Sequence, residues 1–199
     1  VSSVYDGINS VYKCIALSKI PGISGSSELA PFNTLKLPSL SKNILSECSF
    51  RTADYIKELN SPNYIKSIDV EIPDSKKWSK NLLKITLDKS SNINPKYRDN
   101  FESNIIVNYD FGSCKYSARA RISGDWKDHV RFSSGKITSS LDIKLHEGNI
   151  LNAVRFKLLI PETRNGINEV LGSLILKELG FISPETFLVK VDVNNSQDT

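Results

Sequence analysis

The sequence has no methionine and few residues of the kinds that build metal or redox sites: three cysteines, two histidines and two tryptophans among 199 residues. Because the chain begins with Val1, we expect it to be processed or to be a piece of a longer protein. No apolar run approaches the roughly 20 residues that a bilayer span requires. The first residues also lack the charged and then apolar pattern of a signal peptide. The sequence therefore predicts neither a membrane span nor a secretory leader.

Neither sign of charge predominates, because the 26 Lys and Arg residues are nearly balanced by 22 Asp and Glu residues, which gives a formal net charge of +4. The basic residues are interspersed with acids along the chain, which argues against a nucleic-acid-binding stripe. The small positive net charge predicts no more than a weak preference for anionic ligands. With 39% hydrophobic and 24% charged residues, the composition is typical of a soluble globular protein. The length suits one domain, with or without an attached helical segment.

The cysteines are Cys14, Cys48 and Cys114. They are too few and too far apart for a disulfide framework or a zinc site. Three buried free thiols are the favoured interpretation. The alternative is one bridge, between Cys14 and Cys48, in an oxidising compartment.

Residues 1–62 predict a helical arm joined by a linker. Apolar residues at helical spacing predict an amphipathic helix over residues 3–18. Residues 18–41 are rich in Gly, Pro and Ser, which is typical of a long loop or linker. A second helix is expected from Ser41, as its cap, to Leu59. We expect this arm to dock on the main domain.

Residues 63–199 predict a sheet with helices. Period-two alternation predicts strands at residues 67–73, 104–110, 114–123, 141–145, 154–160 and 186–193, and residues 75–88 favour a helix. The strongest helical pattern begins at a cap on Thr163, carries a continuous apolar stripe and stops at Gly180. The predicted fold class is α+β, a mainly antiparallel sheet with one long helix packed on it.

Several motifs in this second part occur in a distinctive order. "RISGDWKDHV" is followed by a strand with a lysine near its end, then "RFKLLIP", then "TRN", a helix with Asn-Glu near its start, and a strand ending in Asn. In this order and spacing, residues 67–194 resemble the spore coat protein H kinase-like family. The resemblance implies the N-lobe of an atypical protein kinase, which binds ATP and Mg²⁺ together with a helical C-lobe that is missing here.

The resemblance also implies which residues contact phosphate. A strand lysine oriented by a helix glutamate would hold the nucleotide, and Lys144 with Glu169 is the preferred pair, with Lys157 as the other lysine. The alternative is that both lysines simply face water. Arg164 and Asn165, at the helix start, either contact phosphate or cap the first turn.

Two more segments are candidates. Ser133, Ser134 and Gly135 lie between two predicted strands, where a hairpin covers the phosphates in a kinase-like lobe; an ordinary hairpin tip is the alternative. The densest polar stretch suggests either a metal site, which we do not favour, or a tight turn whose indole covers the sheet edge and whose acids accept backbone N–H bonds. Its residues are Gly124, Asp125, Trp126, Asp128 and His129.

Two hypotheses of function follow. In the first, a longer protein binds ATP and Mg²⁺ and phosphorylates a protein or surface component. In the second, the chain is a non-catalytic structural or interaction module of a coat, cell surface or virion. The resemblance favours the cell envelope, a coat or a virion surface over the cytoplasm. The 199-residue chain alone is predicted to be catalytically inactive, since it carries no nucleophile elbow and no paired-carboxylate signature.

Overall fold

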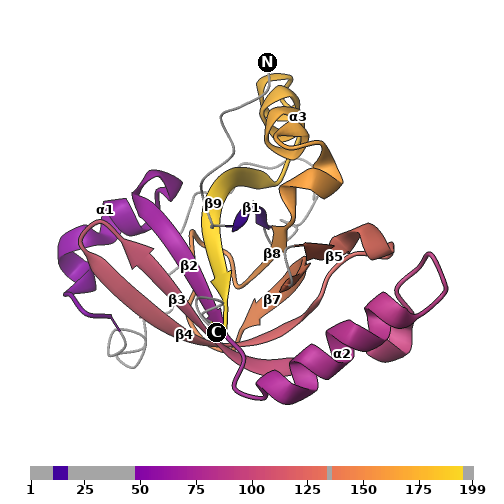
Figure 1. Ribbon diagram of the computed structural model, residues 1–199. Coiled ribbons are helices and arrows are strands. Elements are labelled where there is room, and N and C mark those ends of the chain that lie inside the picture. The colour runs from indigo at the N-terminus through magenta and orange to yellow at the C-terminus, as the bar shows by residue number, and fades with distance from the viewer. Residues whose placement is uncertain (1–10, 18–47, 134–135, 195–199) are drawn as a thin grey trace, which may run out of the picture.

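Most strands of this protein alternate buried apolar residues with outward polar ones, and together they curl into a closed barrel. The computed structural model describes residues 11–17, 48–133 and 136–194. Within these residues the barrel order is β1-β8-β7-β4-β3-β2-β9, with β9 pairing back to β1 (Figure 1). Every neighbouring pair is antiparallel except β2 and β9. The strands are β1 (Val11–Leu17), β2 (Ile65–Glu71), β3 (Phe101–Tyr109), β4 (Gly112–Ile122), β7 (Leu141–Leu145), β8 (Arg155–Leu159) and β9 (Glu185–Val193).

The core fills the barrel. Phe156 is the largest of the side chains that are almost completely buried, and it lies between Ile143 on β7 and the other inward residues. On β4 the inward positions include Ala118 and Ala120, whose small size leaves room for larger side chains elsewhere in the barrel. The predicted antiparallel sheet, its main hairpin and the α+β class are confirmed.

The helix predicted over residues 75–88 is confirmed as α2 (Ser75–Leu87). Asp74 caps it, since its carboxylate accepts a hydrogen bond from the Lys77 N–H at 3.1 Å. Trp78, Leu82 and Ile85 form the buried face and join the barrel core. The ring of Trp78 packs edge-on against Phe101, with the ring centroids 5.0 Å apart.

The N-terminal helix predicted over residues 3–18 is wrong where the structure describes the chain, because residues 11–17 form β1. This strand lies between β8 and β9 and satisfies the backbone of both, which a helix there would leave as open edges. Of the helix predicted over residues 41–59, the described part from residue 48 onward contains only a 3₁₀ turn, η2 (Thr52–Tyr55), and the short α1 (Ile56–Leu59). The predicted linker of residues 18–41 lies outside the described residues.

A disulfide joins Cys48 to Cys114, at the start of β4, so the expected free thiols and the alternative Cys14–Cys48 bridge are both wrong for this pair. The bridge holds residues 48–55 against the β3–β4 turn, where Phe50 packs edge-on to Phe111 at 4.9 Å. Tyr55 stacks on Phe111 with the centroids 4.3 Å apart. Sequence spacing could not give this pairing, because it depends on where the β3–β4 hairpin ends in space.

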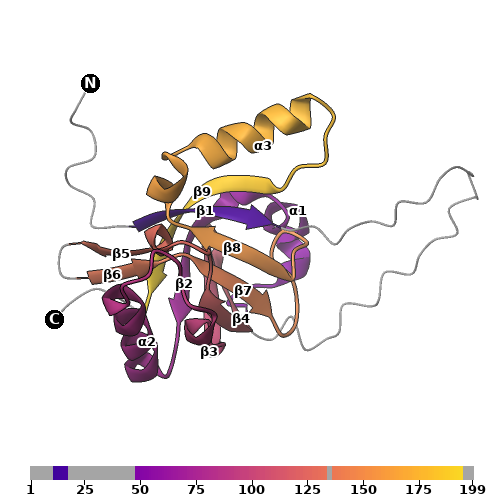
Figure 2. The same cartoon turned by 90° about the vertical axis from the view of Figure 1, so that its right-hand side faces the viewer.

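The C-terminal helix is where packing differs most from expectation. A 3₁₀ turn, η6 (Pro161–Arg164), and a left-handed Asn165 precede it, so α3 (Asn168–Glu178) begins later than Thr163. It lies outside the barrel near β9 (Figure 2). Its apolar stripe is largely exposed, and Leu174 for instance keeps 52% of its surface. The predicted packing is wrong because the apolar faces of the strands point into the barrel core, and α3 contacts the described strands mainly at β9.

Shorter elements complete the chain. They are η3 (Pro62–Tyr64), η4 (Pro95–Tyr97), η5 (Lys127–His129) and a separate hairpin of β5 (Val130–Ser133) and β6 (Lys136–Ser139). Across the described ranges, no helix is both long and apolar enough to cross a membrane.

We expect substitutions in the barrel and on α3 to differ sharply in their effect on stability. Phe156→Ala should lower the free energy of unfolding by about 3–5 kcal/mol, because it leaves a cavity in the core. Leu174→Ser should change it by no more than about 0.5 kcal/mol, since that side chain is half exposed. Urea unfolding followed by circular dichroism measures both. Equal losses for the two variants would contradict the placement of α3.

The disulfide should stabilise the fold strongly. It links residues 66 positions apart, and a loop of that length corresponds to about 4 kcal/mol of lost unfolded-state entropy. The double variant Cys48→Ser, Cys114→Ser should be less stable by that amount in urea unfolding. Reductant should destabilise the wild type and leave the double variant unchanged. A wild type insensitive to reductant would be evidence against the bridge.

Candidate functional site

The outer faces of β4, β7 and β8 carry basic residues in two adjoining rows. In the first row the register places Arg119 opposite Lys144, and Lys144 opposite Arg155. In the second row Asp142 lies between Arg121 and Lys157 in the same way. The residues between them in sequence, such as Ala120 and Ile143, point into the core, so the charged side chains share one face. We call Arg119, Arg121, Lys144, Arg155 and Lys157 the cationic grid.

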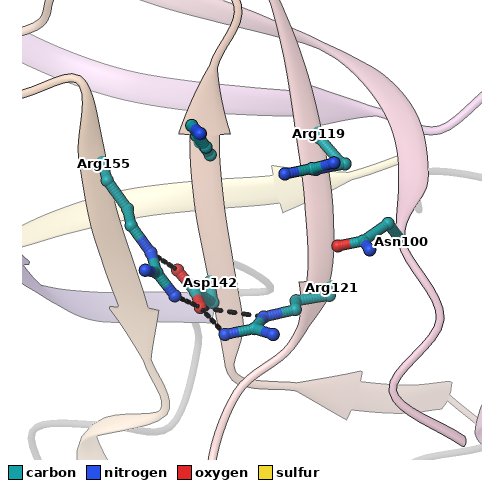
Figure 3. A pocket seen from close by; sticks show the side chains of 6 residues that line it. Asn100, Arg119, Arg121, Asp142 and Arg155 are labelled. Carbon is teal, nitrogen blue, oxygen red and sulfur yellow. Dashed lines mark hydrogen bonds and ion pairs between the residues drawn. The ribbon is translucent and has the colours of Figure 1, made fainter.

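Asp142 is the acid within this grid and is only 5% exposed. Arg121 donates to one carboxylate oxygen from Nε at 2.9 Å and from a terminal nitrogen at 2.7 Å. Arg155 donates from Nε at 2.8 Å to the other oxygen, and its terminal nitrogen also contacts the carboxylate. The two guanidinium groups therefore converge on one carboxylate from opposite sides (Figure 3).

Burial would by itself raise the pKa of the Asp142 carboxyl. The hydrogen bonds from Arg155 and Arg121, and their charges, outweigh burial and lower it below its ordinary value of 3.8. The bond to Asp142 in turn raises the pKa of Arg155. Asp142 is therefore ionised at neutral pH, and it holds the two arginines in fixed positions.

Above this pair lies a hollow of about 200 Å³, lined by Asn100, Arg119, Arg121, Asp142, Lys144 and Arg155. Within the described part of the chain, no side chain forms an ion pair or hydrogen bond with the charged end of Arg119 or Lys144. Glu102, opposite Arg119 on β3, bonds instead to His146 at 2.8 Å. The hollow therefore offers two uncommitted cations beside two fixed guanidinium groups.

The structure does not bring the preferred pair of Lys144 and Glu169 together. Glu169, near the start of α3, pairs with Arg164 at 3.4 Å, while Lys144 belongs to the cationic grid on β7. Lys157 lies in the grid beside Asp142. Asn165 ends η6 in a left-handed conformation and is not the cap of α3, which is Ile167.

The proposed phosphate-covering turn is only partly described. Ser133 ends β5 and lies opposite Lys136 on β6, and Ser134 and Gly135 lie outside the described residues.

The dense polar stretch forms a structural turn around a buried histidine. His129 is almost fully buried, and its Nδ1 lies 3.0 Å from the Ser140 hydroxyl. Gly124 has a φ of +97°, and a Cβ atom there would overlap the His129 ring. Ser140 also accepts a hydrogen bond from the Ile160 N–H at 3.1 Å. This hydrogen-bond network connects the turn to the start of β7 and to the residue that follows β8, so its role is structural.

The other members of the stretch face outward. Among the described residues the partner of the Asp125 carboxylate is Arg98, at 2.7 Å, in place of the expected backbone N–H, and this contact lowers the pKa of Asp125. Trp126 remains 60% exposed, so the expectation that its indole covers the sheet edge is wrong. Asp128 is exposed. In the residues that the structure describes, no three His, Cys, Asp or Glu side chains are grouped to hold a metal ion.

Sequence reasoning did not select Arg119, Arg121 and Arg155, nor Asp142. The signal was present, because alternate residues on three strands are charged in "ARARI", "LDIKL" and "RFKLL". Each pattern alone is typical of a solvent-facing strand. The site emerges only when β7 pairs with both β4 and β8, which the sequence did not determine.

The comparisons with known proteins add no relative: no family model matches the chain, and searches of curated proteins and of solved structures find no match.

We expect His129 to make the fold sensitive to mild acid. Burial, with the nearby charge of Arg164 and Lys157, lowers its pKa below 6.5, so the unfolded chain binds a proton more readily than the folded one. The free energy of unfolding should therefore fall as the pH drops below 6.5. His129→Gln should be less stable at pH 7 but should lose part of this dependence. Urea unfolding between pH 7.5 and 5 tests this, and an unchanged pH dependence in the variant would contradict it.

Proposed function

We propose that this domain binds a phosphate-like oxyanion at the hollow of the cationic grid. The observation that carries the proposal is the pair Arg119 and Lys144, which lack side-chain partners among the described residues and lie beside guanidinium groups fixed by a buried carboxylate. Guanidinium and ammonium groups are the usual side-chain donors to phosphate oxygens. Because Asp142 already orders Arg121 and Arg155, an anion would not have to pay the full entropy of ordering them.

The size of the hollow supports a small ligand group. At about 200 Å³ it is below the usual range for sites that enclose a drug-sized molecule. The ligand that fits this description is a single charged group, and the rest of its molecule would extend into solvent. This supports the hypothesis of a non-catalytic interaction module, for which binding is the whole activity.

An atypical kinase-like protein is the second candidate. It is favoured by one observation, that Lys144, the lysine selected by the family resemblance, lines the hollow. On this proposal the hollow holds a phosphate of ATP, and Mg²⁺ and the catalytic acids come from a C-lobe in a longer protein. The ion pair of Glu169 with Arg164 weighs against the expected orientation of Lys144 by Glu169.

The disulfide indicates the kind of compartment in which the proposed module acts. Disulfides such as Cys48–Cys114 persist in oxidising surroundings and are rare in the reducing cytoplasm. This supports the proposed place at a coat, cell envelope or virion surface, where phosphate-bearing components are binding partners of the right charge.

Removal of Lys144 should weaken anion binding. We expect Lys144→Ala to bind pyrophosphate about fivefold more weakly in calorimetry at low salt, because an exposed ion pair is worth up to about 1 kcal/mol. The matched control is Lys80→Ala, which removes an exposed lysine from α2, outside the grid. Equal affinity of wild type and Lys144→Ala, with both folded, would refute the proposed site.

The same titration separates the two candidates. A kinase-like site should bind Mg-ATP more tightly than Mg-pyrophosphate, because the adenosine adds contacts. An oxyanion module should bind the two equally.

A further inference from the structure

The cationic grid is larger than the hollow. Lys157 lies outside the lining of the hollow, on the opposite side of Asp142 from Arg121 in the second row, and it is exposed. A single oxyanion seated between Arg119 and Lys144 leaves Lys157 without a role in binding.

The spacing of the grid comes from the sheet. Neighbouring strands lie about 4.8 Å apart, and alternate residues on one strand about 6.8 Å apart, so adjacent grid positions repeat at about 5–7 Å. The guanidinium groups of Arg121 and Arg155 are held by Asp142 and do not swing freely toward one point. Fixed charges at regular intervals match a ligand whose own charges repeat, because each added group finds another cation.

We propose that the natural ligand is a linear polyanion, a chain of phosphate or sulfate groups that runs from the hollow past Asp142 to Lys157. This inference rests on the proposed oxyanion site and names its ligand class. The first group binds Arg119 and Lys144, and the following groups meet Arg155, Arg121 and Lys157.

The residues that line the hollow favour a polyanion without bases. Sites for single-stranded nucleic acid combine cations with aromatic side chains on which the bases stack. The lining of the hollow has no aromatic residue, only Asn, Arg, Asp and Lys. A chain recognised by its charges alone, such as a polyphosphate backbone or a sulfated glycan, is the ligand that such a lining fits.

Chain length and salt test the proposal. Pyrophosphate, tripolyphosphate and a polyphosphate of about 14 units are titrated into the whole chain at several salt concentrations. We expect affinity to rise with length, and the slope of log affinity against log salt to steepen from about 2 to about 4 as more cations are engaged. Lys157→Ala should leave pyrophosphate binding unchanged, weaken the longest chain about threefold and reduce its slope by about 1.

The outcomes separate this inference from the proposed function. Pyrophosphate binding with no change in slope for longer chains, or with no effect of Lys157→Ala on them, overturns the polyanion and leaves the oxyanion site standing, provided that the glycan below also shows no Lys157-dependent binding. No binding of any phosphate, with no binding of the glycan below, overturns both.

A sulfated hexasaccharide titrated in parallel distinguishes the two sources of charge. Length-dependent binding of polyphosphate assigns a phosphate chain, and Lys157-dependent binding of the glycan alone assigns a sulfated one. Tighter binding of an oligothymidine of equal charge than of either chain would overturn the proposal in favour of nucleic acid.

Discussion

Strand β1 pairs with β8 on one side and with β9 on the other, and these two ladders make a barrel of what would otherwise be an open sheet. Closure leaves no unpaired edge within the ring, and the buried residues of β2, β3, β4, β7, β8 and β9 form a single core. The outward residues are then free to be charged. The cationic grid forms because three neighbouring strands of the ring, β4, β7 and β8, carry basic residues at their outward positions.

Closure also explains the position of α3. A helix with an apolar stripe normally covers an apolar sheet face. Here the apolar faces of the strands point into the barrel, and the helix that contributes to this core is α2. The helix is attached through its ends and through polar contacts, such as Thr186 Oγ1 donating to the Glu169 carbonyl at 3.4 Å. The stripe of Leu171, Leu174 and Ile175 therefore stays about half exposed among the residues that the structure describes.

Local patterns in the sequence were enough for the elements that are determined locally. Alternation located β3, β4, β7 and β9, and the cap at Asp74 with its apolar spacing fits α2. Local sequence patterns do not determine which strands or cysteines pair over long distances in the chain. β1 has apolar spacing that also fits a helix, and only the vacant edges of β8 and β9 decide between the two. The partner of Cys48 is likewise chosen by the position of Cys114 at the start of β4.

The candidate site divides in the same way. Lys144 and Lys157 could be selected from the sequence as outward strand lysines, and both lie in the grid. The role of Asp142 could not be selected, because a single acid on a strand looks solvated until Arg121 and Arg155 are placed on either side of it. Buried charge is stable only when it is paired, so this carboxylate and its two arginines have to be understood as one unit.

The turn at Gly124 couples two positions of the chain through a steric contact. The ring of His129 fills the space that any side chain at position 124 would need, and the backbone there has the positive φ that glycine tolerates best. A side chain at position 124 would therefore displace the imidazole of His129 and disturb its contact with the Ser140 hydroxyl. Glycine at 124 and histidine at 129 are thus a single steric requirement of the turn that precedes β5, and neither can be replaced without consequences for the other.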